Sequence, residues 1–205
     1  FSHPTGSSAI PDGQNTFVGL QAGNFTMGST AADATTGSSN TGVGYKTLNT
    51  LTSGNWNTAI GANALSKVST GVYNSAVGAN ALSTLGTGSY NLAIGANALS
   101  ADVSGGFNIA FGADVLSNAT GAQNVALGYA SFYGLTTGAA NVGLGFQAGR
   151  YITGGAVANE TTNNSVYIGA LTRAFADGAT NENVFGYATT GLGSNTVTIG
   201  NTSIL

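Results

Sequence analysis

A short phrase of polar, small and apolar residues that ends in glycine recurs along the chain. It reads NTAIG from Asn57 to Gly61 and NSAVG from Asn74 to Gly78. From Gly44 to Gly145, successive closing glycines are 17, 17, 17, 17, 16 and 17 residues apart. The closing glycines are Gly19, Gly44, Gly61, Gly78, Gly95, Gly112, Gly128, Gly145, Gly169, Gly186 and Gly200. A fixed period of this kind indicates an architecture of stacked repeats.

Two columns of large apolar residues run through these units. The residue before the closing glycine is large and apolar in every unit, from Val18 to Ile199, so we expect this column to face an interior. A second column expected to be buried lies four residues after the glycine, at Leu48, Leu65, Leu82, Leu99, Leu116 and Phe132. Alanines between the two columns, such as Ala62 and Ala64, would let neighbouring walls approach closely.

The length of the unit decides between helices and strands. About 17 residues are too few for a helical repeat, which needs about 33 or more, and two glycines per unit would weaken any helix. The same length suits two short strands joined by two turns. The sequence therefore predicts an all-β chain that forms a parallel β-solenoid, or β-roll, of about eleven short coils stacked about 4.8 Å apart.

Polar and glycine positions also recur at fixed places in the unit. A glycine stands three residues before the Asn in seven consecutive units, at Gly37, Gly54, Gly71, Gly88, Gly105, Gly121 and Gly138, and we expect turns of positive φ there. The Asn of each unit is expected to hydrogen-bond to its copies in adjacent coils. The predicted turn or ladder positions are Asn57, Gly61, Asn74, Gly78, Asn91, Gly95, Asn108 and Gly112.

The small side chains suggest how the chain is organised and assembled. One narrow coil buries little, and a core shared among three chains would bury more, so we expect a homotrimer.

We expect an irregular lead-in over residues 1–14, regular repeats over 15–163, and variant repeats over 164–205 that lead into a further domain. The chain starts at Phe1 rather than Met, which suggests a piece of a longer protein.

Composition narrows the possible functions. Charged residues make up 5% of the 205 residues, against about 25% in ordinary soluble domains. Four scattered Lys and Arg residues cannot neutralise a nucleic-acid backbone, and no apolar run is long enough to span a membrane. The single histidine, His3, and the absence of cysteine leave no constellation for catalysis or for a metal ion. We therefore predict no enzyme activity and no cofactor, and we interpret acids such as Asp102 (in a turn) and Asp114 (on an exposed strand) as solvated surface groups.

Two groups of residues are candidates for contact with a receptor or with another chain. The aromatic residues Trp56, Tyr73, Tyr90 and Phe107 precede the recurring Asn in four consecutive units. They would form a ladder that either offers flat faces to sugar rings or a partner protein, or stacks on itself and packs against a neighbouring chain. The second candidate is the longer segment Tyr151–Asn163, with Arg150 and Tyr151, because insertions in a solenoid lie on one face. Phe25–Ser39 is a second interruption of this kind.

The run NTAIGANALSKVSTGVYNSAVGANALSTLGTGSYNLAIGANALS resembles the repeats of phage tail fibres and of trimeric autotransporter adhesin heads. QNTFVGLQAGNFT is similar to the opening repeats of tail-fibre-domain proteins, and residues 164–205 resemble the segment that precedes their intramolecular chaperone domain. The resemblance implies a rigid trimeric β-roll, carried by a virion or exposed outside a cell. The period of 17 departs from the shorter coil of the adhesin heads, so bulged corners are expected.

From these observations we expect a structural segment of a trimeric extracellular or virion fibre that supports host or surface attachment, with a cell-surface glycan or protein as receptor. A bacterial surface adhesin or filament subunit is the alternative. An ice-binding solenoid is less well supported, because no outward Thr column persists along the chain. Phage or bacterial origin and the identity of the receptor stay open.

Overall fold

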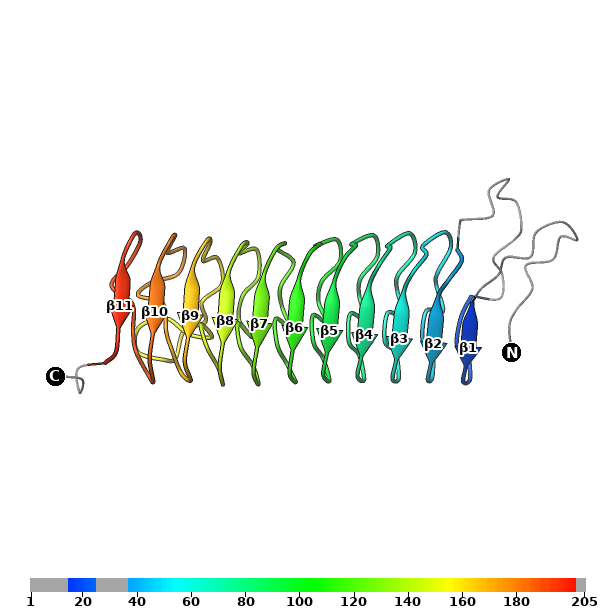
Figure 1. The fold of residues 1–205 in the computed structure, drawn as a ribbon, viewed down its shortest axis with the longest axis horizontal. Coiled ribbons are helices and arrows are strands. Elements are labelled where there is room, and N and C mark those ends of the chain that lie inside the picture. Colours follow the sequence, from blue (N-terminus) through cyan, green and yellow to red (C-terminus); the bar gives the residue numbers. More distant parts are fainter. Residues whose placement is uncertain (1–14, 25–36, 202–205) are drawn as a thin grey trace, which may run out of the picture.

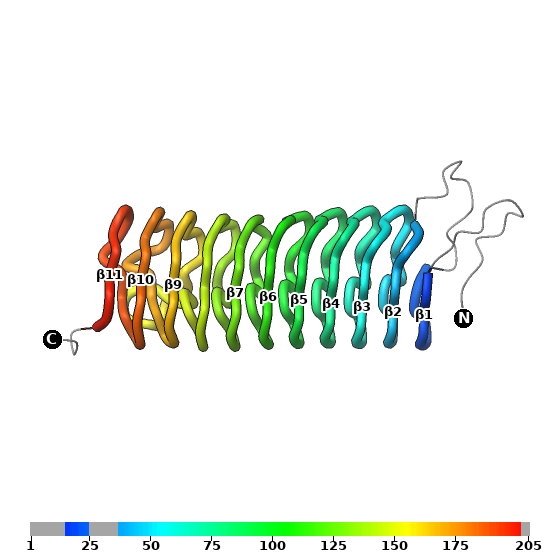
Figure 2. Tube along the Cα trace, in the orientation of Figure 1, coloured from blue at the N-terminus to red at the C-terminus, as the bar shows by residue number. Residues whose placement is uncertain are grey.

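The computed structural model describes residues 15–24 and 37–201, which form a straight rod of stacked coils (Figure 1). Each coil contributes one strand of three residues, and the eleven strands form one parallel sheet in sequence order. The strands are β1 (Thr16–Val18), β2 (Thr41–Val43), β3 (Thr58–Ile60), β4 (Ser75–Val77), β5 (Leu92–Ile94), β6 (Ile109–Phe111), β7 (Val125–Leu127), β8 (Val142–Leu144), β9 (Val166–Ile168), β10 (Asn183–Phe185) and β11 (Val197–Ile199). Figure 2 shows the coils following one another from end to end. The predicted all-β parallel solenoid is confirmed.

The predicted lead-in over residues 1–14 lies outside the described residues, as does most of the first interruption, residues 25–36.

The second wall of each coil consists of turns, so the expectation of two strands per coil was wrong. In this wall Asn63 and Leu65 have φ of 58° and 48°, in the left-handed region. The Leu65 N–H nevertheless donates to the Ala81 carbonyl of the next coil, and the Asn63 N–H donates to the Tyr45 carbonyl of the previous one. The turns therefore satisfy their backbone groups between coils as a strand would, and they keep the parallel stacking.

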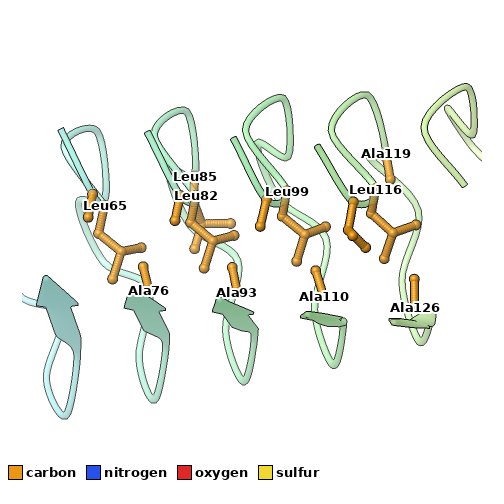
Figure 3. Packing of buried hydrophobic residues seen from close by; sticks show 14 of the residues in the cluster. Leu65, Ala76, Leu82, Leu85, Ala93, Leu99, Ala110, Leu116, Ala119 and Ala126 are labelled. Atoms are coloured by element: carbon orange, nitrogen blue, oxygen red, sulfur yellow. The ribbon is translucent and has the colours of Figure 1, made fainter. Parts of the chain in front are cut away.

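The interior is narrow and is filled by leucines that face alanines. The middle residue of each strand points inward, as Ala76 and Ala93 do, and both are fully buried. Opposite them lie the equally buried Leu82 and Leu99 (Figure 3). A further apolar residue, such as Leu85, is buried beside most of these leucine and alanine pairs. Interiors are close-packed, so the small position leaves room for the leucine that faces it.

The apolar column before the closing glycine faces outward, which corrects the expectation that it lines the interior. Val18, Val43, Ile60 and Val77 are between 36% and 52% exposed. Side chains alternate between the two faces of a strand, so the buried Ala59 forces Thr58 and Ile60 onto the opposite face. Where a leucine faces it, the middle position of the strand is small. Phe17, in the middle of β1, is large and lies against Gly23 instead of a leucine.

The glycines that precede the Asn are needed for close approach and not for positive φ, again contrary to expectation. Of that set, only Gly37 has a positive φ, of 70°. At Gly88 an added Cβ would collide with the Gly105 carbonyl oxygen of the next coil and would lie 2.5 Å from Leu85 Cδ1. The closing glycines do have left-handed backbones, with φ of 137° at Gly78. There too, an added Cβ would lie 2.5 Å from the Gly95 carbonyl oxygen.

A hydrogen-bonded ladder of buried asparagines runs along one corner of the rod. Asn74 Nδ2 donates to Asn57 Oδ1 (3.1 Å) and to the Gly88 carbonyl (2.9 Å). Asn74 Oδ1 in turn accepts the backbone N–H (3.0 Å) and Nδ2 (3.1 Å) of Asn91. The same pattern links Asn40, Asn57, Asn74 and Asn91, and Asn91 Oδ1 continues it to the Asn108 N–H. Each amide thus ties three successive coils together.

Candidate interaction surfaces

The aromatic stack, defined as Trp56, Tyr73, Tyr90 and Phe107, runs along the outside of four successive coils. Its ring centroids are 6.0, 5.1 and 5.0 Å apart in sequence order, and neighbouring ring planes differ by 3°, 13° and 4°. Each residue precedes a buried ladder Asn and has a left-handed φ between 56° and 62°. This backbone bend turns the ring outward while the next side chain turns into the core, and each ring stays about half exposed.

The geometry of the aromatic stack limits its chemistry. Because the rings lie nearly parallel on one another, each inner ring has its faces covered by its neighbours. Ring edges and the hydroxyl groups of Tyr73 and Tyr90 are what the stack presents outward. A sugar that stacks on an aromatic ring needs a free face, so this arrangement fits lateral packing against another surface better than it fits a sugar platform.

A second pair of stacked rings lies at the other end of the strands. Tyr129 and Phe146 follow closing glycines, and their centroids are 5.6 Å apart with ring planes 22° apart. In the coils that carry this pair, the positions equivalent to the aromatic stack hold Gln123 and Ala140. In these two coils the stacked aromatic rings therefore lie at the edge of the sheet opposite to the aromatic stack. Sequence reasoning missed the pair, although aligning the residues that follow the closing glycines shows it.

The outer sheet face, defined as the outward side chains of β2–β9, is a continuous surface made largely of apolar side chains. One of its columns is the residue before each closing glycine. The other is polar in Thr41, Thr58 and Ser75 and then apolar in Leu92, Ile109, Val125, Val142 and Val166. Ile109, Phe111 and Leu127 are between 42% and 51% exposed. Monomeric soluble proteins rarely expose a continuous apolar surface of this kind.

The segment after β8 folds back as a small hairpin that carries Arg150 and Tyr151. Tyr151 pairs with Ala158 in an antiparallel bridge, and the Ile152 N–H donates to the Val157 carbonyl at 3.0 Å. The Arg150 guanidinium carbon lies 4.7 Å from the centre of the Tyr133 ring and 4.8 Å from that of the Tyr151 ring. These two rings come from adjacent coils, so the structure does bring Arg150 and Tyr151 together, in company with Tyr133, which sequence reasoning did not single out.

The acids do not match the interpretation that all of them are solvated. Asp102 is fully buried, and it occupies the place that Leu51 and Leu85 hold in other coils. Burial raises the pKa of Asp102, although the N–H of Gly105 at 2.6 Å and the amide of Asn108 oppose the rise. Asp114 lies in a turn rather than on a strand, where its carboxylate accepts the Asn97 amide at 2.9 Å.

Among the described residues, Glu182 is the other fully buried acid. It accepts the Tyr167 hydroxyl at 2.9 Å and the Gly193 N–H at 2.7 Å. Burial raises the pKa of the Tyr167 hydroxyl well above its ordinary value, so Tyr167 is a donor at physiological pH. Asp102 and Glu182 thus have hydrogen-bond partners inside the rod and are not accessible to a substrate, so we assign both a structural role.

Within residues 15–24 and 37–201, no three His, Cys, Asp or Glu residues are grouped so as to hold a metal ion, and no helix could cross a membrane. Comparison with known proteins gives no match to a family model, a curated protein or a solved structure.

Proposed function

We propose that this chain is a structural segment of a homotrimeric fibre, exposed on a virion or outside a cell, that supports attachment to a host or surface and performs no catalysis. A rod of identical coils fits a spacer, because its length grows with the number of repeats and its buried amide ladder connects coil to coil. The resemblance of its phrases to tail-fibre and adhesin-head repeats favours the same role.

The observation that carries this proposal is the outer sheet face. It spans about 34 Å of stacked strands. With the aromatic stack it is about five residues wide, or about 16 Å. The resulting area of about 540 Å² per chain means that two facing copies would bury about 1,100 Å², which exceeds the roughly 1,000 Å² expected of a specific interface. The described part of this face carries no charged side chain from β2 to β9, so nothing on it opposes contact with another apolar surface.

Copies of the same chain are the occupants that this surface fits best. If the chains lie parallel and in register, cyclic symmetry about an axis along the rod places the same column of each copy at the same height. Isoleucine then meets isoleucine, and the aromatic stack meets the neighbouring chain along its edges. Three copies enclose a shared core along that axis, which supplies the burial that the narrow coil lacks.

A bacterial surface adhesin or filament built from the same rod is the alternative function, and it shares this interface. Ice binding is less well supported because the Thr column of the outer face ends after Thr58, where Ser75 and then Leu92 follow. A regular water-ordering surface would need that column to continue.

A charged substitution on the outer sheet face tests the assembly. We expect Phe111→Asp to reduce the native mass to that of a single chain while the circular dichroism spectrum keeps its β signal, because three carboxylates would be buried near one axis. Val103→Asp is the matched control, since Val103 is 54% exposed but lies in a turn away from the strands. An unchanged assembled mass for Phe111→Asp would contradict the proposed interface.

A further inference from the structure

The pocket beside the hairpin of residues 150–159 has the features of a binding site for a small anionic ligand. Its volume is about 230 Å³, and it lies between this hairpin and the two preceding coils. Its lining includes Asn118, Tyr133, Thr136, Arg150, Tyr151 and Glu160. Such a concentration of hydroxyl, amide and charged groups is unusual in a chain with only 5% charged residues.

Arg150 is the group on which the site depends. The Tyr133 and Tyr151 ring centres lie 4.7 and 4.8 Å from its guanidinium carbon, so the in-plane N–H groups of its two Nη atoms are the ones left for a ligand. Its Nε is buried without a hydrogen-bond partner, and no described carboxylate forms an ion pair with this guanidinium. A guanidinium held in this way is oriented before any ligand arrives, and its planar fork matches a carboxylate through two parallel hydrogen bonds.

The surroundings of Arg150 are fixed by hydrogen bonds. Thr136 donates its backbone N–H to the Glu160 carbonyl at 2.8 Å, and Asp177 Oδ1 accepts the Glu160 N–H at 2.8 Å. Asn118 Nδ2 donates to the Tyr133 carbonyl at 2.8 Å. The second arginine of the chain, Arg173, lies against the same hairpin, since a Cβ added at Gly155 would be 3.3 Å from its Nε. Both arginines of the chain thus lie at this one place on the rod.

We propose that this pocket binds a sugar that carries one carboxylate, such as a uronic acid residue of an acidic polysaccharide. The carboxylate pairs with the Arg150 guanidinium, and the hydroxyl groups of the sugar bond to Thr136, Asn118 and Glu160. Glu160 decides between anions: its carboxylate accepts hydrogen bonds from a polyhydroxylated ring, while it repels the second negative charge of a phosphate dianion. The proposal does not depend on the fibre assembly, because all of these residues belong to one chain.

Ligand-observed saturation-transfer NMR on the full chain tests the proposal, with sodium glucuronate, glucose and inorganic phosphate at equal ionic strength. We expect glucuronate to bind with a dissociation constant in the millimolar range, and glucose and phosphate to bind at least about tenfold more weakly, because each lacks either the charge or the hydroxyl ring. Equal binding of glucose, equal binding of phosphate, or no binding of glucuronate would each overturn the proposal.

Variants separate recognition by Arg150 from its packing role. Arg150→Gln removes the charge and should weaken glucuronate binding at least about tenfold. Arg150→Lys keeps the charge but loses the planar fork, so its affinity for glucuronate should lie between those of the original chain and Arg150→Gln. Lys67→Gln removes an exposed cation elsewhere on the rod and should leave binding unchanged. Circular dichroism checks that each variant is folded. If folded Arg150→Gln bound glucuronate as well as the original chain, the pocket would not be the site.

Discussion

Removal of one amide from the asparagine ladder should destabilise the rod far more than removal of an exposed amide. Asn74→Ala deletes four hydrogen bonds: two donated by its Nδ2, and two accepted by its Oδ1 from the backbone and side chain of Asn91. Asn57 Oδ1 keeps the bond from the residue 74 N–H, and Asn91 Nδ2 keeps the Gly105 carbonyl. The groups left without partners are the Asn91 N–H and the Gly88 carbonyl.

The expected magnitude follows from those two buried groups. Each unsatisfied buried donor or acceptor costs about 1–3 kcal/mol, so Asn74→Ala should lower the free energy of unfolding by about 2–6 kcal/mol. Asn118→Ala is the matched control. The Asn118 side chain makes a single hydrogen bond, to the exposed Tyr133 carbonyl, which water can replace, and its removal should cost about 0.5 kcal/mol.

Urea denaturation followed by circular dichroism measures both changes. All chains are compared at one protein concentration, because an assembled protein gains stability by mass action. A midpoint shift for Asn74→Ala no larger than that for Asn118→Ala would refute the reasoning that the ladder holds the coils together.

Three further predictions concern single coils. Gly88→Ala should prevent stable folding because its Cβ would collide with the next coil, whereas Gly86→Ala, with its nearest contact at 3.5 Å, should change the thermal midpoint little; equal effects would contradict the close-approach argument. Because the pKa of Asp102 is raised on folding, its contribution is fully present below the unfolded value of about 3.9 and is lost as pH rises through the folded value. Asp102→Asn, which keeps an oxygen for the Gly105 N–H, should therefore flatten the decline in urea midpoint as the pH rises above about 4; an unchanged pH profile would contradict this prediction. Tyr90→Leu keeps an apolar side chain but interrupts the aromatic stack, and it should lower the thermal midpoint by a few degrees, about 1 kcal/mol for two lost ring pairs; no shift would show that ring stacking adds nothing beyond apolar contact.

Much of the fold follows from the period of the sequence. A unit of 17 residues with one recurring apolar phrase closed by glycine predicts a parallel solenoid, in which equivalent residues stack on one another. The leucine column at Leu65 and Leu82 was correctly expected to be buried. The recurring Asn indicated an amide ladder, and the hydrogen bonds of Asn57 and Asn74 are of that type.

The direction of the outer apolar column could not be inferred from residue type. Ile60 and Val77 look like core residues, and they belong to the outside because the strand has only one inward position, which the alanine occupies. The strict small residue at Ala59 and Ala76 was the available signal. A second surface that covers this outer column would explain why its side chains are apolar. The repeat pattern of a single chain does not identify that surface.

The remaining features depend on contacts between coils that break the repeat. Asp102 occupies the position that Leu51 and Leu85 hold in other coils. It is buried because this position faces the core, although an acid usually lies at the surface. Arg150 lies 17 residues after Tyr133, one full period, so the repeat alone places these two residues on adjacent coils. The position of Tyr151 over the same guanidinium depends on how the hairpin folds back, and the repeat does not predict that.

The native mass of the chain in solution tests the central claim most directly. Light scattering after gel filtration should give a particle near three times 20.1 kDa. It should resist SDS at moderate temperature, because the proposed trimer would bury the outer sheet faces against one another. A stable, soluble particle of 20.1 kDa at every concentration would contradict the shared core, and with it the proposal that this rod is a segment of a trimeric fibre.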